Sequence, residues 1–325
     1  MQSDPALAQL LSEQTSPFDR LEWWQMLERH CGLEPRIASA RDGAAYAVLA
    51  LTPGRKARSL ANWYTFRFRP VVSASANGRV LLSTIARVLR RKSARITLAG
   101  VPEEDARLLK AAFADAGWAA YRSATDVNHF LLLEGRDFES YLAGRPGPLR
   151  STLERKSGKV ATRIVSHFDP AAWDQYESVY RDSWKPEEGS PAFLRAFAEA
   201  EGAAGRLRLG LAETGGAETG GEIVAAQFWT VDHGTAYIHK LAYRESAKGL
   251  SPGTVLTAAL LRHVIDTDRV ARVDFGTGDD AYKRDWMERM RSLYRLDLLR
   301  RDVPANWPFI LRKRLQALAA GAKRR

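Results

Sequence analysis

The chain has 325 residues, of which 49 are lysine or arginine and 38 are aspartate or glutamate, so its formal net charge is +11. This length suggests about two domains, and an apolar content of 45% supports a buried core and excludes wholesale disorder. No apolar stretch approaches the roughly 18 residues of a membrane-spanning helix, and the first residues do not form a signal peptide. Because Cys31 is the single cysteine, no internal disulfide can form, and we expect a cytoplasmic protein.

The first part of the chain predicts helices and strands in alternation. Apolar spacing and turn residues distinguish the two kinds of element. We expect a short helix, a helix beginning near residue 16, strands at 44–51 and 63–72, a helix at 78–89, a strand at 95–98, a helix at 105–116, and strands near 119 and 129.

Glycine and proline at residues 144–148 predict a boundary between an N-terminal domain, 1–145, and a C-terminal domain, 146–325. The loop at 213–221 predicts a mobile hairpin tip. In this half we expect a basic helix at 149–159, a strand at 160–166, helices at 171–184 and 191–200, strands at 207–212, 222–231 and 236–244, a helix at 252–265, strands at 271–275 and 293–299, and a final helix at 307–320.

The two halves contain a similar helix–strand unit. One begins at Gly78 and ends at Gly100, and the other begins at Gly253 and ends at Gly276, at nearly equal spacing. This pattern indicates a duplicated unit, although helix–strand pairs of this size are common.

Positive charge is concentrated at the end of the chain. Between Tyr282 and Arg325, 13 basic residues accompany four acidic ones. Such a region predicts an anionic partner, which is a phosphate-rich cofactor, an RNA or a membrane surface. The alternative is a solvated basic tail.

A segment between a strand and a helix has the features of a phosphate site. It comprises Lys248, Gly249, Leu250, Ser251, Pro252, Gly253 and Thr254. Ser251 suits the N-cap and Pro252 the first helical position, and Gly253 leaves the backbone open. The unpaired amides and positive dipole end of the first helical turn bind phosphate readily, and Lys248 could add a cation. The alternative is an ordinary capped helix.

A second segment follows a predicted buried strand. Asp274 is followed by glycines, Asp279 and then Tyr282-Lys283. A carboxylate here could accept a proton from an amine, and the Tyr282 hydroxyl could return one to a leaving thiolate. The alternative is a solvated acidic turn paired with Lys283 and Arg284.

In this order, the two segments resemble the GNAT acyltransferase superfamily. The resemblance is closest to the branch with two tandem GNAT-like domains, described as BioF-like or cellulose-biosynthesis-associated (CelD-type), which is related to the Fem-type aminoacyl transferases. It is clearest over residues 150–299, is supported by residues 149–156 and 183–185, and is weaker over residues 63–70. It implies a mixed α/β (α+β) fold of two tandem domains, each with a mostly antiparallel mixed sheet flanked by helices.

The resemblance implies an N-acyltransferase that uses acetyl-CoA, or another acyl-CoA, as co-substrate. The acceptor is then a small-molecule or saccharide amine that attacks directly in a ternary complex, in polysaccharide or envelope metabolism. In the superfamily the pyrophosphate lies on backbone amides of a Gln/Arg-x-x-Gly-x-Gly/Ala loop. Here Lys248 replaces the Gln/Arg, Ser251 replaces the first glycine, and Gly253 keeps the second. The departure leaves the acyl donor open.

Roles at the reacting centre follow from the same resemblance. The candidate proton acceptors are His239, Asp274 and Asp279, and Tyr282 is the candidate acid. A backbone N–H on the strand of His239 and Lys240 would bind the oxyanion. The alternative for a lone strand histidine is a packed core residue.

The strand and the surrounding residues add further expectations. By strand alternation, His239 shares a face with Tyr237, Leu241 and Tyr243. Lys283 would bind acceptor or cofactor phosphate. Three more residues, Trp184, Lys185 and Trp286, are expected to line an acceptor cleft.

Two other functions remain open beside this one. The first is Fem-like transfer from aminoacyl-tRNA, which the basic regions favour and the lack of a long helical-hairpin insertion disfavours. The second is a catalytically inactive GNAT-fold protein whose basic face binds an anionic polymer or a membrane surface. The N-terminal domain lacks both chemistry-bearing segments, so we expect it to be non-catalytic. Six histidines and one cysteine show no metal-ligand spacing, so no metal is expected.

Overall fold

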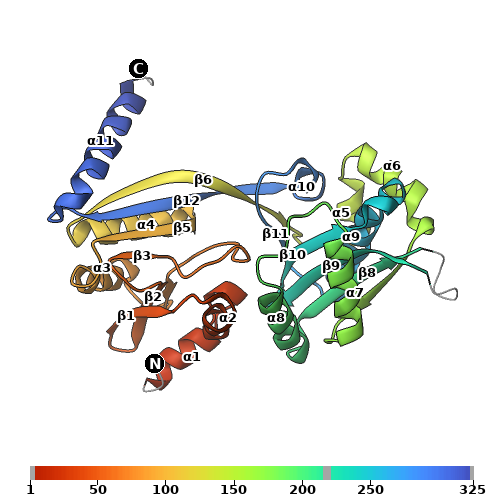
Figure 1. Cartoon of the computed structure of the whole chain (residues 1–325), viewed down its shortest axis with the longest axis horizontal. Helices are drawn as coiled ribbons and strands as arrows, with labels where there is room; N and C mark the ends of the chain where they lie inside the picture. Colours follow the sequence, from red (N-terminus) through yellow and green to blue (C-terminus); the bar gives the residue numbers. More distant parts are fainter. Residues whose placement is uncertain (1–3, 215–220, 323–325) are drawn as a thin grey trace. The chain divides into compact units, whose positions relative to one another are not determined.

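The computed structural model describes residues 4–214 and 221–322 (Figure 1). Most of the predicted hairpin tip, residues 215–220, lies outside the described residues. The chain forms two compact units: unit 1 contains Met1–Val127 and Arg291–Arg325, and unit 2 contains Asn128–Met290. These bounds differ from the expected domains 1–145 and 146–325. Residues 128–132 pair with residues 272–277 of the second half, and residues 293–299 pair with residues 95–102 of the first half.

Unit 1 contains helices at both ends and strands of different lengths between them. In the first part of the chain these are α1 (Pro5–Ser12), η1 (Pro17–Asp19), α2 (Leu21–Cys31), β1 (Arg36–Asp42), β2 (Ala45–Leu51), β3 (Lys56–Arg58), β4 (Val71–Val72), α3 (Gly78–Leu89), β5 (Arg95–Pro102), α4 (Glu103–Asp115) and most of β6 (Trp118–Leu132). From the end of the chain it takes most of β12 (Arg289–Arg300), η5 (Pro304–Asn306) and α11 (Trp307–Ala322).

The strands of unit 1 form two groups. β1, β2 and β4 make a small antiparallel sheet, and β3, β5, β12 and β6 lie side by side in that order. Helices α3 and α4 bury their apolar sides against these strands, in a core that includes Leu82, Phe113 and Trp118. The strand β12 pairs with β5, from Leu293↔Pro102 to Leu299↔Arg95, which places the end of the chain in unit 1.

One predicted strand of unit 1 is wrong. Residues 63–72 were expected to be extended, but only Val71–Val72 form a strand. The Asn62 side chain accepts a hydrogen bond from the Tyr64 amide at 3.0 Å, and the Asn62 amide donates to Thr65 Oγ1 at 3.2 Å. These local bonds give the backbone an alternative to a strand ladder.

Unit 2 consists of a sheet with helices on both faces. Its elements are the end of β6, α5 (Phe138–Ala143), α6 (Gly147–Lys156), η2 (Ser157–Lys159), β7 (Ala161–Val165), α7 (Pro170–Arg181), α8 (Pro191–Ala203), β8 (Leu207–Glu213), β9 (Ile223–Asp232), β10 (Thr235–Tyr243), η3 (Glu245–Leu250), α9 (Pro252–Arg262), η4 (His263–Thr267), β11 (Arg272–Thr277), α10 (Ala281–Trp286) and the start of β12.

The strand order in unit 2 is β6, β11, β10, β9, β8, β7. Only β10 and β11 run parallel, and the other neighbours are antiparallel. Trp229 faces the core formed with α5, α6 and α9, whereas the preceding residue, Phe228, contacts Trp173 of α7 and Phe197 of α8. This alternation confirms the predicted mixed, mostly antiparallel sheet flanked by helices.

The helix–strand unit predicted in each half is present in the structure. In unit 1, α3 leads into β5, and in unit 2, α9 leads into β11. None of the helices among the described residues is both long enough and apolar enough to cross a bilayer.

Candidate functional site

The site lies where two parallel strands of unit 2 separate. β10 and β11 pair at Thr235↔Arg272, Ala236↔Val273 and Tyr237↔Asp274. β10 then continues to Tyr243 and β11 to Thr277 without further pairing between them among the described residues. Backbone groups that leave a ladder need other partners. This opening is therefore a place where a ligand can meet the backbone.

A β-bulge lies next to this opening. On β9, Trp229 and Phe228 are consecutive, but they pair with Ile238 and Lys240, so His239 is the extra residue. A bulge places neighbouring side chains on one face and reverses the alternation beyond it. His239 contacts Phe197 of α8, and Lys240 contacts Tyr180 of α7.

The bulge corrects the predicted face of the strand. His239 and Tyr237 do share a face, and their rings stack with centroids 6.3 Å apart. Leu241 and Tyr243 instead pack against the core on the other side of the sheet. Strand alternation from the sequence could not locate the extra residue.

His239 lies in an apolar setting. Its ring centroid is 5.1 Å from both Phe197 and Phe228, and its Nε2 is 2.8 Å from Thr230 Oγ1. Burial, followed by the charge of Lys240, lowers the pKa of His239 to about 3. The ring is therefore neutral at pH 7 and only weakly basic, which favours a packed histidine over a proton acceptor.

Helix α9 begins beside this opening. Ser251 occupies the N-cap position with φ 54°, but its side chain makes no capping hydrogen bond, unlike the prediction. Pro252 is the first helical residue, as predicted, and has no N–H. The amides of Thr254 and Val255 donate to the Ser251 carbonyl at 3.1 and 3.2 Å. In the first turn, the Gly253 amide thus remains for a ligand.

Gly253 is confined by an aromatic neighbour. A Cβ at this position would lie 3.1 Å from Tyr243 Cδ1, so the position needs a small residue. The Tyr243 ring in turn lies 4.3 Å from the ring of Trp184, which is 47% exposed. Trp184, predicted to line the acceptor cleft, therefore lies at the start of α9.

The loop before α9 is anchored and carries a cation. Lys156 Nζ donates to the Gly249 carbonyl at 2.8 Å, and Leu250 packs on the unit 2 core. The Lys248 side chain is 70% exposed, and its ammonium is 3.9 Å from Glu245. Lys248 can therefore turn toward an anion near Gly253.

Asp274 and Lys283 hold the loop after β11. The Asp274 carboxylate is buried and accepts hydrogen bonds from Asn128 Nδ2 at 2.7 Å and from the Gly276 amide at 3.0 Å. The Lys283 ammonium donates to the Thr277 carbonyl and lies 3.6 Å from Asp280. Both side chains are directed into this loop, so the structure favours a bracing role for each over proton transfer or phosphate binding.

Asp279, on the same loop, forms an ion pair with Arg284 of α10 and a hydrogen bond with His129 of β6. Its carboxylate lies 2.5 Å from Arg284 Nη2 and 3.0 Å from His129 Nε2. The hydrogen bond from Arg284, followed by that from His129, holds the pKa of Asp279 below its usual value. This arrangement matches the paired acidic turn that was the alternative to a proton acceptor.

Tyr282 has a different environment. Its ring meets Phe275 edge to face at 5.6 Å between centroids, and 37% of the residue is exposed. Burial of the hydroxyl, with the Asp280 charge, raises the pKa of Tyr282 above its usual value. The phenol is therefore protonated at pH 7 and able to donate.

A cavity of about 510 Å³ lies between α7, α8 and the loop that joins them. Its wall includes Tyr176, Tyr180, Lys185, Glu187 and Glu188. The Glu188 carboxylate is 2.8 Å from Lys240 Nζ, beside the bulge. Neither Glu188 nor this role for Lys240 was predicted from the sequence, because no periodic pattern marks a loop residue that contacts a strand.

Lys185 links the cavity to the loop after β11. Desolvation, followed by the charge of Lys240, lowers the pKa of Lys185, and the charges of Asp280 and Lys283 also act on it. Lys240 lies on β10, Asp280 precedes α10 and Lys283 lies on α10. Trp286 is 4% exposed and belongs to the unit 2 core, so it does not line this cavity as expected.

No group of three or more histidine, cysteine, aspartate or glutamate side chains with metal-binding geometry occurs within residues 4–214 and 221–322.

Comparisons with known proteins agree with this architecture. Residues 148–284 match the family model of an acetyltransferase (GNAT) domain. A search of curated proteins gives no match. Similar solved structures are the C-terminal domain of a candidate lysylphosphatidylglycerol synthetase from Agrobacterium fabrum (14% identity, 95% of this chain and 94% of that chain, TM-score 0.62), FemX (12%, 86% and 90%, 0.61) and a tandem GNAT protein from the clavulanic acid biosynthesis pathway (16%, 90% and 93%, 0.50).

At these identities the structural likeness concerns the fold. Together with the family match, it confirms the predicted GNAT acetyltransferase domain and its Fem and tandem-GNAT neighbours. The narrower assignment to the BioF-like or CelD-type branch stays a prediction.

We predict that His239 makes stability depend on pH. The unfolded imidazole binds a proton as the pH falls through 6.5, whereas the folded one does so only near 3. The free energy of unfolding should therefore decrease as the pH falls from 6.5 toward about 3, by up to about 1.4 kcal/mol per pH unit from this residue. Above pH 6.5 this residue should contribute no pH dependence. In His239→Gln the decline, measured by urea unfolding at several pH values, should be shallower. The exposed His167→Gln variant is the control, and equal slopes in all three proteins would contradict the assignment.

Proposed function

We propose that the GNAT domain of residues 148–284 transfers an acyl group from a CoA thioester to an amine acceptor. The observation that carries this proposal is the opening between β10 and β11. Three features meet around it: the start of α9 at Gly253, the protonated hydroxyl of Tyr282, and the cavity that carries Glu188. In this order, the three features would bind the anionic part of the donor, donate a proton to the leaving group and bind the amine.

The residues at the start of α9 fit a diphosphate in part. The Gly253 amide and the dipole of α9 favour negative charge, and Lys248 supplies an exposed cation. Gly253 also keeps the backbone accessible beside Tyr243. In this proposal these groups hold the CoA diphosphate, and the thioester supplies the activated acyl group, with acetyl as the expected acyl group.

The bulge is the proposed site for the acyl oxygen. Backbone N–H groups that point at developing negative charge stabilise acyl transfer strongly. The extra residue at His239 alters the direction of the backbone where β10 leaves β11. We assign oxyanion binding to the backbone of residues 239–240 and not to the imidazole.

Proton transfer is assigned to Glu188 and Tyr282. Glu188 already lies 2.8 Å from one ammonium, that of Lys240, and a carboxylate at that place can bind the acceptor amine and take its proton. Tyr282 can donate to the departing thiolate. Asp274, Asp279 and Lys283 hold the loop that precedes Tyr282 and α10.

The described part of unit 1 has no counterpart of the reacting residues. Its helix α3 begins at Gly78 with Asn77 as the N-cap, and its strand β5 leads directly into α4 without a Tyr-Lys segment. We therefore assign no chemistry to unit 1.

Aminoacyl-tRNA-dependent transfer is the second candidate. Pro252 has no backbone N–H, and the Ser251 carbonyl already accepts hydrogen bonds from the amides of Thr254 and Val255. The start of α9 therefore offers few donors to a diphosphate. FemX and the Agrobacterium fabrum domain share the fold over most of the chain. An acceptor in lipid or envelope chemistry suits either candidate.

We predict that acetyl-CoA, and not tRNA, stabilises the protein. A ligand at about 100 times its dissociation constant adds about 2.7 kcal/mol to the free energy of unfolding. The thermal unfolding midpoint of the full chain should therefore rise with acetyl-CoA, and rise less in Lys248→Ala. No shift with acetyl-CoA, together with a shift caused by tRNA, would favour the second candidate.

Replacing Tyr282 by phenylalanine should lower kcat with little effect on acetyl-CoA binding. Loss of a positioned acid typically costs about 10²–10⁴-fold. Release of free CoA with a panel of amino sugars, amino acids and polyamines measures kcat, and calorimetry measures binding. Tyr294→Phe, in unit 1, is the matched control. An unchanged kcat in Tyr282→Phe would remove Tyr282 from the mechanism.

Replacing Glu188 by glutamine should weaken use of the amine. The neutral amide loses its charge attraction for an ammonium and cannot take its proton, so we expect kcat/KM for the amine to fall about tenfold or more, while KM for acetyl-CoA changes little. Glu187 lines the same cavity but is exposed, so Glu187→Gln is the control. Equal losses in both variants would indicate a general charge effect instead.

A further inference from the structure

Helix α11 contacts the rest of unit 1 through one side. Ile310 is 9% exposed and packs against Ala119 and Leu299. Lys313 Nζ lies 3.2 Å from Asp297, and the Phe309 ring lies 4.7 Å from the Arg95 guanidinium carbon. These three α11 residues share one side of the helix, which is therefore the attached side.

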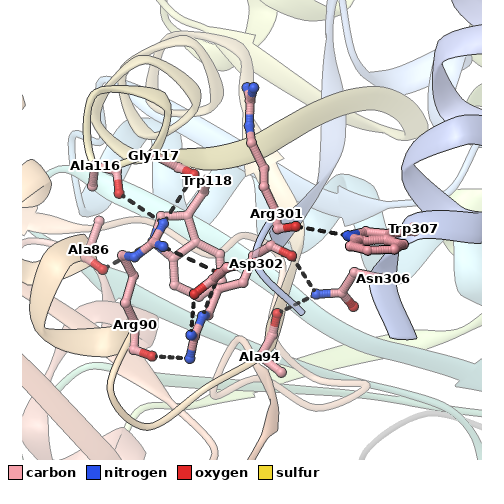
Figure 2. Close-up of polar contacts among 11 residues, drawn as sticks. Ala86, Arg90, Ala94, Ala116, Gly117, Trp118, Arg301, Asp302, Asn306 and Trp307 are labelled. Carbon is pink, nitrogen blue, oxygen red and sulfur yellow. Dashed lines mark hydrogen bonds and ion pairs between the residues drawn. The ribbon is translucent and has the colours of Figure 1, made fainter. Parts of the chain in front are cut away.

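The start of α11 is fixed by a polar cluster (Figure 2). Asn306 Nδ2 donates to the carbonyls of Ala94 at 2.8 Å and Arg300 at 3.0 Å, and Trp307 Nε1 donates to the Arg301 carbonyl at 2.9 Å. Asp302 sits 2.5 Å from Arg300 Nη2, and its other oxygen lies 3.2 Å from Arg90 Nη2.

The cluster also ties α11 to the body of unit 1. Arg90 donates to the carbonyls of Ala116 at 3.3 Å and Gly117 at 3.1 Å. The direction in which α11 leaves β12 is therefore set by hydrogen bonds and ion pairs, and Figure 1 shows its C-terminal half extending beyond the other elements of unit 1.

The opposite side of α11 carries an apolar stripe. Trp307, Leu311 and Leu315 recur every four residues, which places them on one face of a helix. They are 58%, 59% and 57% exposed. Large apolar side chains gathered on an exposed face mark a binding surface.

Unbalanced positive charge surrounds this stripe. Arg301, Arg312 and Arg314 are exposed and form no ion pair within the part of the chain that the structure describes. The sequence continues to Lys323, Arg324 and Arg325. The partner must therefore supply both an apolar phase and negative charge.

An anionic lipid surface meets both requirements. RNA supplies phosphates but no apolar phase for Leu311 and Leu315. A second copy of the chain could cover the stripe, but it carries the same net charge of +11 and brings no excess of anions. A helix with aromatic and leucine side chains on one face and arginines around them lies along the headgroup region of a bilayer.

We propose that α11 docks this protein on an anionic membrane surface, with Trp307, Leu311 and Leu315 inserted below the headgroups and Arg301, Arg312 and Arg314 bound to lipid phosphates. The helix lies on the membrane and does not cross it, since no described helix is long and apolar enough to span. Docking is expected to weaken as salt screens the charges.

The test is co-sedimentation of the full chain with vesicles. Vesicles of phosphatidylglycerol and phosphatidylcholine should bind the protein at low salt, and vesicles of phosphatidylcholine alone should bind it at least about tenfold less. The double variant Leu311→Ser, Leu315→Ser should bind the anionic vesicles at least about tenfold more weakly. The matched control is Val80→Ser, Val88→Ser on α3, whose side chains are 54% and 55% exposed in the same unit.

A second readout does not depend on a folded double variant. Vesicles with brominated acyl chains should quench tryptophan fluorescence of the wild type, and most of this quenching should be absent in Trp307→Phe. The proposal is overturned if the wild type does not bind anionic vesicles, if the leucine and valine variants bind equally, or if quenching persists in Trp307→Phe. It is equally overturned if the leucine variant instead dissociates a dimer, or if tRNA alone binds to the Arg312 and Arg314 region.

Discussion

The proposed site depends on the place where the parallel ladder between β10 and β11 stops. Beyond Tyr237 and Asp274 the two strands no longer pair, and the extra residue at His239 follows at once. A sheet that continued its ladder here would have no room for a ligand among its backbone groups. The opening is supported from both faces, by α9 on one and by α7 and α8 on the other.

The lysines around the opening differ in how closely they are paired with acidic groups. Lys283 is occupied by the carbonyl of Thr277 and by Asp280, and Lys240 is paired with Glu188. Lys248, by contrast, is 70% exposed, and its ammonium lies 3.9 Å from the Glu245 carboxylate. The neutral His239 contributes no charge at pH 7. The result is an exposed cation near the start of α9 and paired charges near the proposed reacting centre. This distribution suits an anionic co-substrate at α9 and proton transfer at the reacting centre.

Most of the elements followed from the sequence. Apolar spacing and the Ser-Pro-Gly segment located α9, and the glycine-rich run after Asp274 located the end of β11. The strand expected at 63–72 failed because Asn62 makes local hydrogen bonds that no apolar pattern reveals. Strand β1 was missed because Arg36–Asp42 is polar and only partly buried.

The site was harder to predict than the fold. The resemblance proposed Tyr282 and Gly253 as site residues, which stays a prediction, and it could not show that Asp274 and Lys283 bond to the loop after β11. Glu188 lies in the segment between α7 and α8, which has no hydrophobic periodicity, so no sequence pattern predicts its contact with Lys240. The bulge likewise depends on how β9 and β10 align, which is a property of pairing and not of either strand alone.

The order of the strands along the chain affects how the protein folds during translation. β5 belongs to the first part of the chain, but its neighbour β12 is translated only after the whole of unit 2. Until then β5 presents an unpaired strand edge, a known hazard for aggregation. Unit 2, in contrast, is one continuous segment, Asn128–Met290. During synthesis on the ribosome, the unit that starts first is thus the one that finishes folding last.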